Sequence, residues 1–168
     1  MKTLLTAATL GLALLIPACA QTLDINLDAL AAKAKQKVEV TLEGSLLTQA
    51  LDKVPGNVKG FTGNLSRLVV RHYEFDKPGQ YADADLDGIR KQVSNASGWS
   101  RVISNKEEHE SIDIYMLTQG GKPGGFLLVA GEEKQLTVVH VVGSIDLASL
   151  QEVVASTIQY DLTKAAGQ

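Results

Sequence analysis

Three aspartates spaced two residues apart, Asp83, Asp85 and Asp87, are followed at once by Gly88. This D-x-D-x-D-G pattern matches the first half of a calcium-binding loop, in which alternate carboxylates coordinate the ion and the glycine permits a sharp turn. The twelfth position of such a loop is a bidentate glutamate, whereas this chain has Ser94 there. Two hypotheses therefore stand: a weak calcium site, or acidic residues that cap and stabilise the first turn of a helix.

Histidine is the second residue type that could do chemistry, and the chain has three. His72 and Glu74 share one face of a predicted strand, and a metal or acid–base cluster would form if His140 from another strand met them. The alternative is that His140, which lies among valines, is a hydrogen-bonded histidine of the core. His109 lies in the charged stretch 107–110, which is more typical of a solvated turn than of a metal site.

The elements that must position these residues are mainly strands. Two mainly apolar runs, 126–130 and the valine-rich 136–142, have apolar residues on both faces, which predicts that they form a central pair. The glycine-rich stretch 120–125 is predicted to be a turn that leads into this pair and completes a four-strand meander. Other strands are predicted over residues 38–42, 65–75, 99–105 and 111–117.

Helical spacing of apolar residues recurs in four segments. These are residues 23–37, residues 45–53, a helix capped by Asp83 or Asp85, and residues 146–158. The last segment repeats apolar residues at the spacing that packs one helix face on a sheet, namely Leu147, Leu150, Val154 and Ile158. The predicted fold is therefore α+β: a single domain with a mostly antiparallel sheet of about six strands and three to four helices packed mainly on one face.

The start of the chain has the composition of an export signal, because Lys2 precedes the almost wholly apolar run 4–16, which is too short to span a membrane. The small residues before Gln21 favour cleavage after Ala20. Alternatively, the segment that ends at Cys19 resembles a bacterial lipobox, in which the cysteine becomes the lipidated first residue. The predicted divisions are a signal peptide at 1–20, a helical segment at 21–37, the α+β domain at 38–158 and a frayed tail at 159–168.

Composition narrows the function classes. The chain has 168 residues, 45% of them hydrophobic, and a net charge of −3. Its basic residues are scattered, which argues against a nucleic-acid-binding protein, since such a protein shows a basic face or stripe. Cys19 is the only cysteine, so the exported domain is predicted to have neither a disulfide nor a thiol nucleophile.

Five segments resemble, in order and spacing, the bacterial exported family known as domain of unknown function 4252. They are Val-Glu-Val-Thr-Leu-Glu-Gly-Ser-Leu-Leu at 38–47, Tyr-Glu-Phe-Asp at 73–76, Ile-Arg-Lys-Gln-Val at 89–93, Gly-Trp-Ser-Arg-Val-Ile-Ser at 98–104, and Leu-Thr-Val-Val-His-Val-Val-Gly-Ser-Ile-Asp-Leu at 136–147. The resemblance covers nearly the whole chain after the export signal. It implies export to the cell envelope and a small α+β domain, and it brings no catalytic residues.

The function favoured by these observations is that of a non-enzymatic envelope protein that binds another protein or an envelope component. The chain shows no nucleophile or acid–base set at a recognisable spacing, and no cofactor is expected. Membrane contact is expected only if Cys19 is lipidated. The first alternative is a calcium-dependent or small-ligand binding module, and the second is a hydrolase that uses His72, Glu74 or His140.

Overall fold

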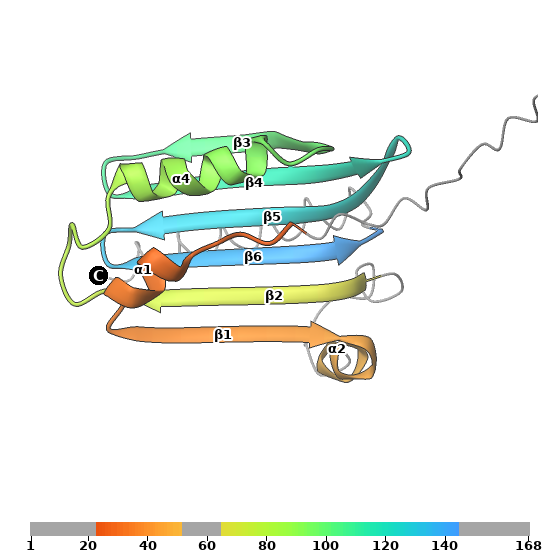
Figure 1. Ribbon diagram of the computed structural model, residues 1–168, viewed down its shortest axis with the longest axis horizontal. Coiled ribbons are helices and arrows are strands. Elements are labelled where there is room, and N and C mark those ends of the chain that lie inside the picture. The colour runs from red at the N-terminus through yellow and green to blue at the C-terminus, as the bar shows by residue number, and fades with distance from the viewer. Residues whose placement is uncertain (1–22, 52–64, 145–168) are drawn as a thin grey trace, which may run out of the picture.

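Six antiparallel strands form one sheet in the order β1-β2-β6-β5-β4-β3 (Figure 1). The computed structural model describes residues 23–51 and 65–144. The strands are β1 Gln36–Glu43, β2 Leu65–Glu74, β3 Trp99–Lys106, β4 Glu110–Gln119, β5 Lys122–Glu132 and β6 Gln135–Gly143. The predicted α+β class and the predicted six-stranded antiparallel sheet are therefore confirmed.

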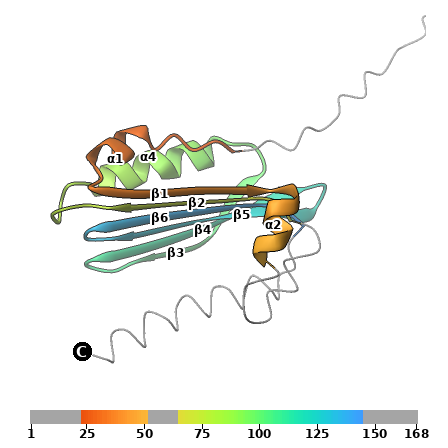
Figure 2. The same ribbon diagram turned by 90° about the horizontal axis from the view of Figure 1, so that it is seen from below.

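The described part of the chain has three helices, α1 Asp28–Lys33, α2 Gly44–Leu51 and α4 Asp83–Ser94. Figure 2 shows α1 and α4 side by side on one face of the sheet, whereas α2 lies at the end of β1 and β2. The helices are therefore divided between one face and one end, which differs from the predicted packing mainly on one face. None of these helices is long and apolar enough to cross a membrane.

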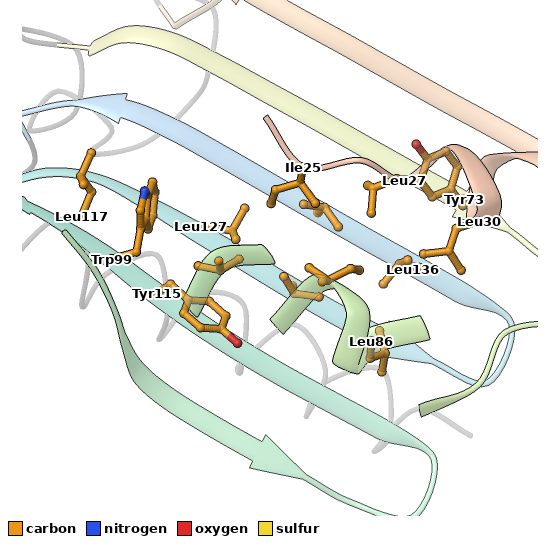
Figure 3. Packing of buried hydrophobic residues seen from close by; sticks show 14 of the residues in the cluster. Ile25, Leu27, Leu30, Tyr73, Leu86, Trp99, Tyr115, Leu117, Leu127 and Leu136 are labelled. Carbon is orange, nitrogen blue, oxygen red and sulfur yellow. The ribbon is translucent and has the colours of Figure 1, made fainter. Parts of the chain in front are cut away.

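The main core lies between the sheet and this helical layer (Figure 3). Each element contributes side chains at its own period, every second residue from a strand and every third or fourth from a helix. Trp99 is buried in this layer, at the start of β3. The fully buried side chains include Tyr73, Ile89, Val93, Leu117, Leu127 and Leu136.

The pair β5 and β6 occupies the middle of the sheet, and strands β3 to β6 follow one another as the predicted meander. The stretch 120–125 is not all turn. Only Gly120 and Gly121 form the turn, with φ angles of 56° and 76°, while Gly124 and Gly125 belong to β5. Gly125 approaches β6 so closely that a Cβ atom there would lie 2.6 Å from the Val141 carbonyl oxygen. The strand therefore begins at Lys122, because Lys122 and Pro123 pair with β4, and the glycine at position 125 permits the close approach of β6.

The helix predicted over residues 23–37 was too long. Only Asp28–Lys33 is helical, and Gln36 and Lys37 already pair with β2. The backbone N–H of Lys35 donates to the Glu74 carbonyl oxygen (2.8 Å), so hydrogen bonding to β2 begins where the predicted helix would have continued. The preceding residues Ile25 and Leu27 are nevertheless buried, and they pack as an extended strap over the sheet.

Several sequence predictions lie outside the described residues. They are the signal peptide at 1–20 with Cys19, Ala20 and Gln21, the helix over 146–158, and the frayed tail at 159–168. They remain predictions.

Candidate functional site

The three aspartates of the calcium-type motif lie in the first turns of α4, and each pairs with a different cation. A continuous helix replaces the loop that calcium coordination needs, because residues two apart on a helix point about 200° apart around its axis. The oxygen–nitrogen distances are 2.6 Å from Asp83 to Lys106, 3.2 Å from Asp85 to Lys33 and 2.8 Å from Asp87 to Arg90. The geometry supports helix stabilisation by acidic residues.

Neither Asp83 nor Asp85 occupies the N-cap position, but Asp85 caps the helix with its side chain from the third helical position, so the predicted capping is confirmed for Asp85 and wrong for Asp83. Ala82 has the extended backbone of an N-cap (φ −124°, ψ 167°), and Asp83 is already the first helical residue. The Asp85 carboxylate accepts a hydrogen bond from the Ala82 N–H (2.9 Å), which is the main cause of a lowered pKa at Asp85. The hydrogen bond from Lys106 likewise lowers the pKa of Asp83.

The predicted cluster of His72, Glu74 and His140 does not form. The register pairs His72 with Thr137 and Val69 with His140, so the two histidines project from opposite faces of the sheet. His72 Nδ1 lies 2.9 Å from the Thr137 hydroxyl, and its Nε2 lies 3.8 Å from Glu74 on the face without α1 and α4. No acid–base or metal set can join side chains that the sheet separates.

His140 is buried, as the core hypothesis expected, with 6% of its surface exposed. Its Nε2 atom has no hydrogen-bond partner, which differs from the expected hydrogen-bonded histidine. The ring meets Trp99 edge-on, with 5.5 Å between the ring centroids. Burial lowers the pKa of His140 from its usual value near 6.5 to about 4, and the positive charges of Arg67 and Arg71 lower it further in the same direction. The imidazole is therefore neutral at pH 7.

A cavity of about 20 Å³ lies beside His140, between the strap and β2. Arg71 donates a hydrogen bond to the Ile25 carbonyl oxygen (2.6 Å) and lies 3.6 Å from Asp24, so this arginine holds the strap on the sheet. Arg67 Nε lies 3.0 Å from a Glu43 carboxylate oxygen and forms an ion pair with it. The geometry of this contact is not that of a hydrogen bond, so the Arg67 Nε–H has no hydrogen-bond acceptor among the described residues. Such a volume suits about one water molecule, so the cavity is too small for an organic substrate.

A second cavity of about 270 Å³ lies where the β3–β4 turn, the β5–β6 turn and the chain before α4 meet. It contains the predicted charged turn 107–110, whose His109 Nδ1 lies 2.7 Å from Glu133. Tyr81 forms one wall and donates its hydroxyl hydrogen bond to the carbonyl oxygens of Glu132 and Gln135. Among the described residues, no group of three His, Cys, Asp or Glu side chains could hold a metal ion. The turn is a solvated charged turn, as its composition indicated.

Asp113 is a buried charged residue that was not predicted from the sequence. Asp113 is only 2% exposed, and its two carboxylate oxygens accept hydrogen bonds from Arg90 Nε (2.7 Å) and from the Ser104 hydroxyl (2.7 Å). The signal was present, because Asp113 stands between two isoleucines on a strand and faces the helical layer. The contacts join α4 to β3 and β4, which is a structural role.

The edge strand β1 is an open surface of the sheet. It pairs with β2 through eight consecutive residues without a bulge, and nearly all its side chains are exposed. On the face without α1 and α4, Val38 and Val40 are 44% and 39% exposed. The opposite edge, β3, has a bulge between Arg101 and Ile103. A long, regular edge strand with an exposed apolar side is a template for another strand.

A family model described as a domain of unknown function, DUF4252, matches residues 30–153. The chain belongs to the DUF4252 family. The DUF4252 match begins inside α1 and includes all six strands, so it covers the sheet together with α2 and α4. It confirms the resemblance found from the five sequence segments. Searches of the curated proteins and of the solved structures found no match to the chain.

Proposed function

We propose that this DUF4252 protein is an exported envelope protein without enzymatic activity, and that it binds a protein partner along strand β1. The observation that carries the proposal is the open edge of β1, an eight-residue strand with a continuous register and no proline. Alternate backbone N–H and C=O groups of an edge strand point away from the sheet, where an extended segment of a partner can pair with them.

The side chains of β1 favour one side for recognition. On the helical side, Glu39 accepts a hydrogen bond from Tyr73 (2.5 Å) and Glu43 pairs with Arg67, so these charges are already engaged. On the other side, Val38 and Val40 are exposed and adjacent. A partner strand would therefore gain main-chain hydrogen bonds along the edge and apolar contacts with these two valines.

Export is supported by the sequence alone. A basic residue, an apolar run too short to cross a membrane and small residues before Gln21 are the parts of a signal peptide. The absence of catalytic activity is supported by geometry, because the sheet separates His72 from His140 and the three aspartates of α4 are paired with cations. These arrangements leave recognition as the function with a structural basis.

Two matched substitutions test the proposal. Val38→Lys places a charge on β1, and Val102→Lys places the same charge on β3, where the native side chain is similarly exposed at 48% compared with 44% for Val38. The chain from residue 21 to 168, immobilised with each substitution, is incubated with envelope extract from the producing cells. The proposal expects a protein retained by the parent chain and by Val102→Lys and lost with Val38→Lys.

Hydrogen exchange then locates the contact. With the retained protein bound, amide exchange should slow at alternate residues of β1 and stay unchanged in β3. Equal loss with both substitutions, or protection confined to another element, would overturn the assignment to β1. Protection of β1 by a second copy of this chain, seen as a dimer in light scattering, would replace the foreign partner with self-association.

A separate experiment tests the first alternative function, a calcium-dependent binding module. Thermal melts of the same chain in millimolar calcium and in chelator should coincide, because a ligand raises the melting temperature only if it binds the folded state. A rise with calcium that disappears in Asp85→Ala would instead favour the calcium-dependent module.

A further inference from the structure

The face of the sheet opposite α1 and α4, called here the second face, is apolar across its full width. The register aligns one residue from each strand into rows that cross the sheet. One row is apolar in all six strands: Val40, Val70, Val139, Leu128, Ile114 and Ile103. The next row is apolar in five strands: Leu42, Leu68, Val141, Phe126 and Met116. Such a face needs a cover.

Burial on the second face is uneven. On the central strands, Phe126 and Val141 are 5% and 3% exposed, while Leu128 and Val139 beside them are half-buried. Ile114 on the neighbouring strand β4 is 4% exposed, whereas at the two edges Val40 and Ile103 are 39% and 38% exposed. Neither α1 nor α4 lies on this side, and α2 lies at the end of the sheet (Figure 2). Cross-strand neighbours alone shield the flanks of a side chain and leave its tip open. Buried side chains on the inner strands between exposed side chains on the edge strands therefore indicate that a segment about as wide as one helix packs over the middle of this face.

The chain that follows β6 is suited to be this cover. Gly143 ends β6 with a φ of 145°, a conformation that side chains rarely adopt and that redirects the backbone. Residues 146–158 follow almost at once, and the spacing of their apolar residues predicts a helix with one apolar face. Because β6 is in the middle of the sheet, a short connection suffices to reach the centre of the second face.

The dimensions agree with this pattern of burial. A helix over 146–158 would be about 20 Å long and, with its side chains, about 10 Å wide. Six strands about 4.8 Å apart span about 24 Å. One helix therefore covers the central strands and leaves both edges uncovered, as the exposures of Val40 and Ile103 require.

We propose that residues 146–158 of the same chain dock as an amphipathic helix on the second face, over β5 and β6. Leu147, Leu150, Val154 and Ile158 supply the apolar side of this helix. The proposal is independent of the proposed function, and it leaves the edge strand β1 free for a partner.

A cysteine-labelling experiment tests the docking, because the exported chain from residue 21 contains no cysteine. Val141→Cys reports the centre of the second face and Val40→Cys reports its edge, and both change the same residue type. The proposal expects the thiol at 141 to react at least about tenfold more slowly than the thiol at 40, since it becomes accessible only when the helix opens.

Two double substitutions separate helix docking from burial by the sheet itself. Leu150→Glu with Val154→Glu charges the apolar side and should accelerate labelling at 141 about tenfold or more. Ser149→Glu with Ser156→Glu adds the same charges to the opposite side of the predicted helix and should leave the rate unchanged. Circular dichroism of each variant checks that the sheet is folded.

Three results would overturn the proposal. The first is rapid labelling at 141 in the parent chain, which would mean that nothing covers the centre. The second is an equal response to the two double substitutions. The third is protection at 141 that falls with dilution alongside dissociation of a dimer, because a second copy would then be the cover.

Discussion

At the scale of single residues, burial decides the chemistry of this protein more than residue type does. His140 has the side chain of an acid–base catalyst, yet it is enclosed by Trp99 and the strap, and its pKa falls to about 4. Asp113 has the side chain of a metal ligand, yet both its oxygens are used to hold Arg90 and Ser104. Burial therefore keeps the His140 imidazole neutral at pH 7 and gives Asp113 a structural role.

The first prediction concerns the pH dependence that His140 imposes. The unfolded chain takes up a proton at this residue near pH 6.5 and the folded chain only near pH 4, so stability is lost as the pH falls through this window. The loss attributable to His140 is on the order of 3 kcal/mol. Urea unfolding at pH 7 and pH 4.5 should show a smaller loss in His140→Leu than in the parent chain. Equal losses would show that the imidazole titrates normally.

The second prediction separates two carboxylates that bind the same arginine. Asp113→Ala leaves Arg90 with no buried partner and should reduce the free energy of unfolding by about 3 kcal/mol or more. Asp87→Ala removes an exposed partner of the same guanidinium and should cost less than about 1 kcal/mol. Urea unfolding at pH 7 measures both. Similar costs would contradict the view that burial sets the strength of these pairs.

The candidate site could be predicted only in part at this scale. Alternation correctly placed His72 with Glu74 on one face of a strand, and His140 with Leu136 and Val138 on one face of another. Whether His72 and His140 lie on the same face of the sheet depends on whether His140 pairs with an even-numbered or an odd-numbered residue of β2. It pairs with Val69, so the two histidines lie on opposite faces. Sequence spacing within one strand carries no information about that register.

At the scale of elements, the strands were easier to predict than their ends. The apolar runs of β5 and β6 predicted both strands and their central position, because strands that are apolar on both sides must be covered on two faces. The helix predicted over 23–37 and the turn predicted over 120–125 were both too long. Pairing with the distant strand β2 overrode the local preference in the first case, and pairing of Lys122 and Pro123 with the adjacent strand β4 overrode it in the second.

The third prediction uses two adjacent glycines of β5. Gly125→Ala would press a methyl group against the backbone of β6, which cannot move without opening the central pair, so it should cost about 1–3 kcal/mol. Gly124→Ala meets only the flexible end of Gln119 and should cost less than about 1 kcal/mol. Thermal unfolding of the two variants compares them. A larger cost at Gly124 would contradict the close approach of β5 and β6.

At the scale of the whole molecule, the sheet presents three different surfaces. One face is packed under α1, α4 and the strap, the second face is apolar, and β1 offers an open edge (Figures 1 and 2). The length of the chain indicates that one core can form, since a domain of roughly this length buries about two thirds of its unfolded surface. It did not predict which surface stays open, because strand order is a property of the fold.

The fourth prediction concerns the N-terminus of the mature protein, if the chain is exported as we propose. Cleavage before Gln21 predicts an intact mass equal to that of residues 21–168, with no thiol. Mass spectrometry of the protein recovered from the envelope measures this directly. A mass that corresponds to a chain starting at a diacylated Cys19 would replace a diffusing protein with one confined to a membrane surface.

The edge-on contact between Trp99 and His140 gives the protein an internal optical probe. Trp99 is the only tryptophan of the chain, and its indole ring lies 5.5 Å from an imidazole that is neutral at pH 7. An imidazolium quenches indole emission more strongly than an imidazole does. The fluorescence intensity of the unlabelled protein should therefore follow the charge of one buried ring, and loosening of the strap would be visible without any added dye.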